Sequence, residues 1–181
     1  MPRRGIFLDR DGTVNVDHGY LFRIEEWQFI EGATEAIRRL RDAGFAVALV
    51  TNQSGVGRGR YTLEDVLTLH AYVQRRLAEQ ATILDAIAVC PHSPDEECAC
   101  RKPRTGMAED VERQLGDKID YAASWTIGDK ISDIGFGIHL GTHTALLHSS
   151  YWDEAPTDDP PDLIAESLFE AAQVILEGPS Q

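Results

Sequence analysis

Two carboxylates, Asp9 and Asp11, stand one residue apart at the end of a short apolar stretch, residues 5–8. Side chains along a strand alternate between its faces, so these two point the same way unless the turn at Gly12 and Thr13 intervenes. Like charges directed at one spot repel each other unless a cation lies there or one group is protonated. The pair therefore predicts a divalent metal site with one carboxylate free for chemistry. The alternative is an ordinary surface turn, in which Asp and Gly are common.

Two further apolar runs also end in polar residues. Residues 45–50 lead into Thr51, and residues 125–127 lead into Asp129 after one glycine. In an open α/β sheet, ligands bind beyond the carboxyl ends of the strands. We therefore expect Thr51 and Asp129 to meet the first carboxylate pair in one crevice.

Such a crevice suits phosphoryl transfer to a carboxylate. Asp9 would form an acyl phosphate, and Asp11 would protonate the leaving alkoxide and then activate a water molecule. Mg²⁺, with Asp129 among its oxygen ligands, would offset the charge between the carboxylates and the phosphoryl oxygens. The Thr51 hydroxyl and a cation would hold the remaining phosphoryl oxygens. The candidate cations are Lys102 and Lys130.

All the cysteines of the chain lie in one short loop, residues 90–100, beside a histidine. The four candidate ligands are Cys90, His92, Cys98 and Cys100. Three thiolates and one imidazole form a closed tetrahedral set for a structural Zn²⁺. This clustering favours metal binding in a reducing compartment over a disulfide framework. The alternatives are a solvent-exposed loop with free thiols, or two cysteines that pair by chance. A zinc ion here would fix the loop that presents Arg101 and Lys102.

Strand-like and helix-like segments alternate along the chain. Strands are predicted at residues 5–8, 45–50, 86–90, 125–127 and 144–147, and helices at residues 35–43, 63–77, 107–115 and 163–176. This alternation predicts an α/β fold with a doubly wound parallel sheet. Segment 14–20 is predicted to be a polar flap near the first strand end. We expect a single domain over residues 1–181 with a minimal cap, because the segments joining the strands are short.

The polar residues that follow the predicted strands, together with Lys102, resemble in their order along the chain the four motifs of the haloacid dehalogenase superfamily. The matching residues are Asp9-Arg10-Asp11-Gly12-Thr13, Thr51-Asn52-Gln53, Lys102 and Gly128-Asp129-Lys130-Ile131-Ser132-Asp133. The resemblance covers about residues 5–141 and extends to residues 15–20, 51–59, 100–103 and 106–107. It is strongest to two families of that superfamily, the heptose-1,7-bisphosphate 7-phosphatases and the histidinol-phosphate phosphatases.

The resemblance implies an aspartyl-phosphate mechanism that depends on Mg²⁺. Asp9 is implied to be the nucleophile and Asp11 the acid and base. The ion would be held by Asp9, by the backbone carbonyl of Asp11 and by Asp129. Asp133 would hold these ligands in position without binding the ion itself.

The same resemblance assigns residues to the substrate. Thr51 and Lys102 would stabilise the phosphoryl group, and Arg101 would recognise the distal part of the substrate. The residues implied to line the substrate pocket are Asp17, His18, Gly19, Tyr20, Asn52, Gln53, Ser54 and Lys130.

The leading prediction is hydrolysis of a heptose bisphosphate at its 7-phosphate, within nucleotide-activated heptose synthesis. Histidinol phosphate is the alternative substrate, favoured by the short stretch between His92 and Cys98, whereas residues 55–59 favour the heptose enzyme. A polynucleotide 3′-phosphatase shares Lys102-Pro103 and Gly106-Met107, but the net charge of −13 opposes binding to a phosphate backbone. A zinc-stabilised binding module without catalysis is disfavoured, because every proposed catalytic position holds a competent residue.

Composition sets the remaining expectations. A chain of 181 residues with 43% apolar and 26% charged residues is typical of a globular protein with a sizeable core. Its negative charge disfavours nucleic acid and anionic lipid as partners. The longest apolar run, residues 45–50, is far too short to cross a bilayer. We therefore expect a monomeric cytoplasmic enzyme that acts on a small phosphorylated substrate.

Overall fold

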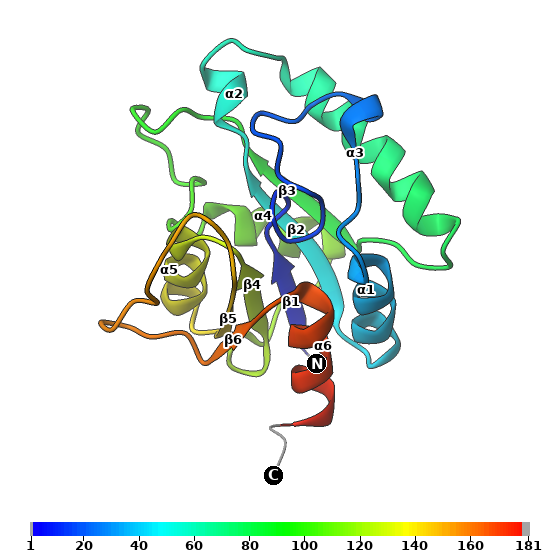
Figure 1. The fold of residues 1–181 in the computed structure, drawn as a ribbon, viewed down its shortest axis with the longest axis vertical. Helices are drawn as coiled ribbons and strands as arrows, with labels where there is room; N and C mark the ends of the chain where they lie inside the picture. The colour runs from blue at the N-terminus through cyan, green and yellow to red at the C-terminus, as the bar shows by residue number, and fades with distance from the viewer. Residues whose placement is uncertain (1, 179–181) are drawn as a thin grey trace.

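A six-stranded parallel sheet forms the centre of the molecule in the computed structural model, which describes residues 2–178 (Figure 1). The strands are β1 (Gly5–Leu8), β2 (Ala46–Asn52), β3 (Ala86–Cys90), β4 (Trp125–Gly128), β5 (His143–Leu147) and β6 (Leu163–Ala165). Their order across the sheet is β3-β2-β1-β4-β5-β6, and every neighbouring pair is parallel. The order reverses between β1 and β4, where an open sheet leaves a crevice at its carboxyl edge.

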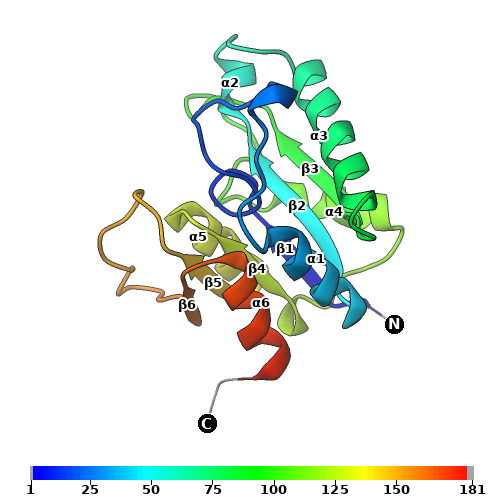
Figure 2. The same cartoon turned by 45° about the vertical axis from the view of Figure 1, so that its right-hand side comes forward.

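Helices cover both faces of this sheet. The helices are α1 (Ala33–Asp42), α2 (Ser54–Gly57), α3 (Leu63–Ala78), α4 (Gly106–Leu115), α5 (Ile131–Leu140) and α6 (Leu168–Glu177), with 3₁₀ turns η1 (Ile24–Glu26) and η2 (Tyr121–Ala123). Buried side chains of α1, α3 and α6 belong to one apolar cluster, and those of α4 and α5 to another. Helices α1 and α6 lie side by side in both views (Figures 1 and 2). The predicted doubly wound α/β fold is confirmed.

Strands β1 and β2 are buried on both faces of the sheet, and their apolar residues run without interruption as far as Leu8 and Val50. In β1, Ile6 and Leu8 belong to the cluster under α1, whereas Phe7 between them belongs to the cluster under α4. This alternation is the two-residue period of a strand. Phe7 also packs edge-to-face on Phe136 of α5, with ring centroids 5.9 Å apart. In these two strands polar residues occur only at the carboxyl end, at Thr51 and Asn52 of β2.

The predicted helix over residues 163–176 is wrong in its first turn. Leu163–Ala165 form β6, which pairs with β5, and α6 begins only at Leu168. The Asp162 carboxylate accepts hydrogen bonds from the backbone N–H and the hydroxyl of Thr144, and so fixes β6 beside β5. The Ser167 hydroxyl then accepts the N–H of Glu170, which caps α6 at its N-terminus.

Helix α5 was not predicted, because Gly135 and Gly137 lower its helix propensity. The fold needs these glycines for close packing, since a Cβ atom at Gly137 would lie 2.6 Å from the Thr144 side chain. At the start of α3, Thr62 and Asp65 form a capping box. Among residues 2–178, no helix is long and apolar enough to cross a membrane.

Candidate active site

A cavity of about 310 Å³ opens at the carboxyl ends of β1 and β2, beside the start of α5. Many residues singled out from the sequence line it: Asp9, Asp11, Asp17, Gly19, Tyr20, Asn52, Gln53, Ser54, Arg101, Lys102, Lys130 and Asp133. Thr51 and Asp129 are buried and do not line it. His18 does not line this cavity; together with Gly19 and Trp27 it lines a second hollow.

Lys102 lies at the centre of the site, with only 4% of its surface exposed. Its Nζ atom lies 2.7 Å from Asp9 Oδ1 and 2.6 Å from Asp133 Oδ1, and it donates a hydrogen bond to the Val50 carbonyl at 2.8 Å. Burial alone would lower the pKa of Lys102, but the two carboxylates outweigh burial and raise it. Burial would likewise raise the pKa of Asp9, but Lys102 and Lys130 hold it below its ordinary value. Asp9 is therefore an ionised carboxylate at neutral pH.

The carboxylates of Asp9, Asp129 and Asp133 converge, with one oxygen from each lying within 4.8 Å of the others. Among the described residues, the buried Asp129 Oδ2 has no hydrogen-bond partner. Burial and the nearby Asp9 raise the pKa of Asp129 to about 7. Gly12, with φ of +86°, allows the turn after β1 to lie close to the Asp129 carboxylate. A Cβ atom at residue 12 would lie only 2.2 Å from Asp129 Oδ2. An unpartnered oxygen among three carboxylates fits a hard divalent cation such as Mg²⁺.

The Asp11 carboxylate lies outside this cluster, because the turn after β1 directs it elsewhere. The Arg10 guanidinium donates to both of its oxygens, and the amides of Asn15 and Gln53 donate one hydrogen bond each. The backbone carbonyl of Asp11 faces the cluster instead and accepts from Lys130 Nζ at 3.2 Å. Asp11 thus presents a carbonyl to the candidate metal site and keeps its carboxylate available for proton transfer.

Arg10 positions Asp11 from within the core. It is fully buried, and it also donates a hydrogen bond to the Leu21 carbonyl at 2.6 Å. Its Nη1 atom lies 3.4 Å from Nε2 of the buried His70. Burial, followed by the charge of Arg10, lowers the pKa of His70 to about 3, so the imidazole is neutral. A neutral ring can face a buried guanidinium without repulsion.

Gln53 links Thr51 to Asp11. Its amide Nε2 donates to Thr51 Oγ1 at 2.7 Å and to Asp11 Oδ2 at 3.0 Å. Its Oε1 accepts the Tyr61 hydroxyl at 2.8 Å, which sets the orientation of the amide. Because Thr51 Oγ1 accepts a hydrogen bond from Gln53, its own proton can be donated to another acceptor.

Lys130 connects the carboxylate cluster to the flap of residues 14–20. Its Nζ atom lies 3.1 Å from Asp129 Oδ1, 3.7 Å from Asp9 Oδ2 and 3.7 Å from Asp17 Oδ2. Tyr151 donates its hydroxyl to Asp17 Oδ2 at 2.6 Å, and this hydrogen bond raises the pKa of Tyr151 to about 12. The phenol therefore remains a donor at all physiological pH values.

Three residues of the cavity were missed by sequence reasoning: Tyr61, Ser132 and Tyr151. Ser132 lies inside the motif at residues 128–133, so its position could have suggested it. Tyr61 and Tyr151 are single tyrosines without a spacing that indicates chemistry. Only the folded chain brings them to the strand ends.

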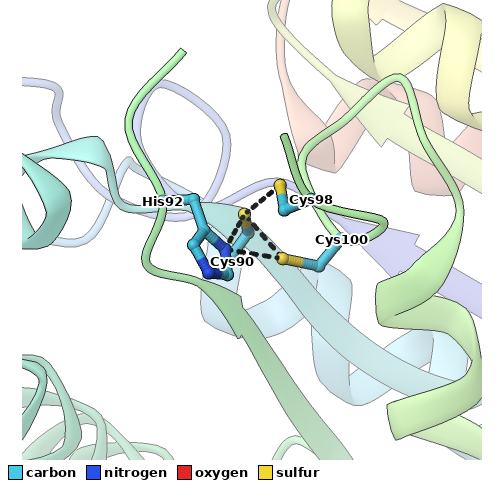
Figure 3. A group of neighbouring side chains, drawn as sticks. All are labelled: Cys90, His92, Cys98 and Cys100. Carbon is cyan, nitrogen blue, oxygen red and sulfur yellow. Dashed lines mark hydrogen bonds between the residues drawn. The ribbon is translucent and has the colours of Figure 1, made fainter. Parts of the chain in front are cut away.

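The cysteine loop forms a second, separate cluster (Figure 3). The side chains of Cys90, His92, Cys98 and Cys100 point toward one another, and their ligand atoms all lie within 4.8 Å. The sulfurs of Cys90 and Cys98 are 3.8 Å apart, the spacing of about 3.8 Å that tetrahedral Zn–S bonds of about 2.3 Å produce, whereas those of Cys90 and Cys100 are 2.8 Å apart and would have to separate to bind the same ion. None of the three cysteines forms a disulfide. The donor set and its convergence fit a structural zinc ion.

This cluster is joined to the cavity by backbone hydrogen bonds. The N–H of Gln53 donates to the Cys90 carbonyl at 2.8 Å. Two residues after Cys100, the N–H of Lys102 donates to Asn52 Oδ1 at 3.0 Å, and Asn52 Nδ2 donates back to the Lys102 carbonyl at 3.3 Å. A rigid cysteine loop therefore fixes the backbone on both sides of the candidate phosphoryl site.

Comparisons with known proteins agree with this chemistry. The family model described as polynucleotide kinase 3 phosphatase matches residues 6–151. The chain is 47% identical over 149 residues to a D-glycero-beta-D-manno-heptose-1,7-bisphosphate 7-phosphatase of Yersinia pestis, covering 78% of each chain. It is 39% identical over 178 residues to that of Escherichia coli strain K12, covering 94% of this chain and 92% of the relative.

Solved structures give the same result. The D,D-heptose 1,7-bisphosphate phosphatase of B. bronchiseptica, in complex with magnesium and phosphate, superposes with a TM-score of 0.84 at 33% identity. The match covers 97% of this chain and 99% of that structure. A HAD-like phosphatase from Mesorhizobium loti superposes with a TM-score of 0.80 at 26% identity. The match covers 96% of this chain and 88% of that structure.

Proposed function

The chain belongs to the D-glycero-beta-D-manno-heptose-1,7-bisphosphate 7-phosphatases of the haloacid dehalogenase superfamily, and we propose that it hydrolyses the 7-phosphate of that sugar bisphosphate. The observation that carries the reaction is the buried Asp9–Lys102 ion pair beside the unpartnered carboxylate oxygen of Asp129. A nucleophile held ionised by a buried lysine, next to a place for a divalent cation, suits phosphoryl transfer.

The first half of the reaction transfers the phosphoryl group to the protein. A carboxylate oxygen of Asp9 attacks phosphorus, and the bond from phosphorus to the sugar oxygen breaks. A protonated Asp11 gives its proton to the departing alkoxide, while Arg10 and Gln53 hold its carboxyl group in place. Thr51 and Lys102 donate hydrogen bonds to the phosphoryl oxygens, where negative charge increases.

The second half returns the protein to its starting state. Asp11, now a carboxylate, accepts a proton from water as the water oxygen attacks phosphorus. The bond between phosphorus and the Asp9 oxygen breaks, so Asp9 is again a free carboxylate and inorganic phosphate is released. Each half-reaction has one bond formed, one bond broken and one proton moved through Asp11.

Mg²⁺ fits the site formed by Asp9, Asp129 and the Asp11 carbonyl, and the related B. bronchiseptica structure contains magnesium and phosphate. The bound ion would neutralise charge between the carboxylates and the phosphoryl group. Asp133 would serve as a support, because one of its oxygens pairs with Lys102 and the other accepts the Lys130 N–H. Zn²⁺ would bind the four ligands of the cysteine loop and leave no open position for catalysis.

The remaining predicted pocket residues would recognise the sugar and its second phosphate. Arg101, on the rim after the cysteine loop, is a cation suited to a distal phosphate. The flap residues Asp17, Gly19 and Tyr20, with Asn52, Ser54 and Lys130, would surround the sugar hydroxyls. His18 keeps only a peripheral role in this proposal, because it faces another hollow.

We further propose that the enzyme works as a monomer in the cytoplasm. Three free cysteines that converge on one metal site fit a reducing compartment. Sedimentation of the purified protein at micromolar concentration tests the monomer, and a dimer whose dissociation abolishes activity would contradict it.

Steady-state phosphate release with Mg²⁺ tests the function. The substrates are both anomers of the heptose bisphosphate, histidinol phosphate and a 3′-phosphorylated oligonucleotide. We expect the highest kcat/KM on the heptose bisphosphate. Higher kcat/KM on histidinol phosphate would move the protein to the sister family and leave the Asp9 mechanism intact. The oligonucleotide is included because the matching family model is described as a polynucleotide kinase 3 phosphatase. The net charge of −13 disfavours binding to a phosphate backbone, so a preference for the oligonucleotide would contradict that expectation.

A further inference from the structure

Tyr151 lies at the wall of the cavity, on the connector between β5 and β6, residues 148–162. Two contacts beside it anchor this connector. Ser149 Oγ donates to the Asp129 carbonyl at 2.8 Å, and Trp152 Nε1 donates to the Leu147 carbonyl at 3.1 Å. The Trp152 ring also stacks on His148, with ring centroids 5.0 Å apart. Tyr151 is therefore held at the end of β4 and β5 and is not on a free loop.

The Tyr151 side chain joins this connector to the opposite side of the cavity. Its hydroxyl donates to Asp17 Oδ2 at 2.6 Å, across 134 residues of sequence. The other Asp17 oxygen accepts the Gly19 N–H at 2.8 Å. Both oxygens of Asp17 are thus oriented, and the flap of residues 14–20 is tied to the connector by a single phenol.

The ring of Tyr151 also covers a charged residue of the site. Lys130 Nζ lies 4.4 Å from the ring centroid, within cation–π distance, and the same atom contacts Asp9 and Asp129. Even so, 55% of the Tyr151 surface is exposed. A fixed aromatic ring that remains half exposed at a cavity wall is available to a ligand.

We propose, on the basis of the function given above, that Tyr151 is a substrate-positioning residue that closes the cavity through Asp17 and selects a polyhydroxylated phosphate ester. A sugar would place its C–H face on the exposed part of the ring and donate a hydroxyl to the oriented Asp17 carboxylate. A substrate without hydroxyl groups gains nothing from this pair. Tyr151 acts on binding, because it contacts neither Asp11 nor Lys102.

The test compares wild type with Tyr151→Phe on the heptose bisphosphate and on phenyl phosphate, which has no sugar hydroxyls. The variant keeps the ring over Lys130 and loses only the hydrogen bond to Asp17. We expect KM for the bisphosphate to rise about fivefold to tenfold with kcat changed less than about twofold, as for the loss of one hydrogen bond. We expect kcat/KM on phenyl phosphate to stay within about twofold of wild type.

Two further variants make the comparison specific. Tyr72→Phe removes the hydroxyl of another tyrosine, which accepts from Arg76 on α3 away from the cavity, and should behave as wild type. In a double variant with Asp17→Ala, the Tyr151→Phe change should raise KM no further, because each change alone removes the hydrogen bond between Tyr151 and Asp17. Full additivity of the two effects would contradict a role through Asp17.

The proposed function and this inference can fail separately. If wild type prefers the bisphosphate but Tyr151→Phe leaves its KM unchanged, the role of Tyr151 is wrong and the function stands. An equal loss on both substrates also overturns it, since the effect would then concern Lys130 or the fold. If wild type shows no preference for the bisphosphate over phenyl phosphate, the proposed function fails and the selectivity of Tyr151 fails with it.

Discussion

Two clusters of candidate metal ligands meet at Lys102, and they are built in opposite ways. The cysteine cluster comes from one stretch of chain, residues 90–100, and its four ligands are enough to close a tetrahedral zinc site. The carboxylate cluster joins Asp9 at the end of β1 with Asp129 after β4 and Asp133 in the first turn of α5. It borders an open cavity and retains an oxygen without a partner.

The difference separates a structural from a catalytic design. A closed set of soft ligands can bind an ion tightly and stiffen a loop, but it offers no position to a substrate. An incomplete set of hard ligands can share its ion with a phosphoryl group, and it must be assembled with counter-charges such as Lys102. We therefore expect changes in the first cluster to affect stability most, and changes in the second to affect turnover most.

The largest effect is expected from Asp9→Asn. An amide cannot form an acyl phosphate, so phosphate release should fall by about 10³-fold or more. The fold should persist, because Lys102 keeps its ion pair with Asp133 and its hydrogen bond to Val50. Phosphate release and circular dichroism measure the two properties.

The matched control is Asp110→Asn, a change of the same type on the exposed side of α4, where Asp110 pairs only with Arg113. It should leave turnover and folding as in wild type. Substantial turnover by purified Asp9→Asn protein would show that another residue is the nucleophile.

A smaller and different effect is expected from Cys98→Ser in the other cluster. The variant should lose its zinc, measured by elemental analysis, and its Tm should fall by about 5–10 °C. Turnover should fall by only about tenfold, through the backbone that connects Cys100 to Lys102. Glu97→Gln changes the neighbouring exposed residue and should alter neither property. Zinc loss without a change in Tm would contradict a structural role.

The two clusters also differ in how much of their geometry could be predicted from the sequence. The cysteine set could be predicted from residues 90–100 because its ligands are close in sequence. The strand ends could be predicted to meet, because a parallel sheet places its carboxyl ends at one edge. The direction of the Asp11 side chain could not, because it depends on Arg10 and on a turn at Gly12.

Other features depended wholly on the folded chain. Tyr61 and Tyr151 reach the cavity only through tertiary structure, and no local spacing indicates them. The sequence predicts a helix at residues 163–165 because an apolar triplet fits a helix as well as a strand. The contact between Asp162 and Thr144, which places these residues beside β5, is visible only in the folded chain. α5 was missed because tight packing, not helix propensity, accounts for its glycines.

The smallest effect is expected from pH, and it also distinguishes the two clusters. In protein dialysed free of Mg²⁺, the pKa of Asp129 is raised to about 7 in the folded state, above its ordinary value of 3.8. Between those values the folded state holds a proton that the unfolded chain releases, so stability falls as pH rises. From pH 6 to pH 8 we expect Tm to decrease by about 3 °C.

Saturating Mg²⁺ should reverse this trend, because the ion binds only the ionised carboxylate and its stabilisation grows as the proton leaves. Asp129→Asn should remove most of the slope, since its amide does not titrate. Calorimetric scans at several pH values with and without Mg²⁺ measure both effects. An unchanged slope in the variant would assign the titration to Asp133, whose pKa burial also raises. The cysteine cluster should keep its zinc over this pH range. If Tm instead fell in step with the loss of zinc, the pH dependence would belong to the cysteine cluster and not to the carboxylate cluster.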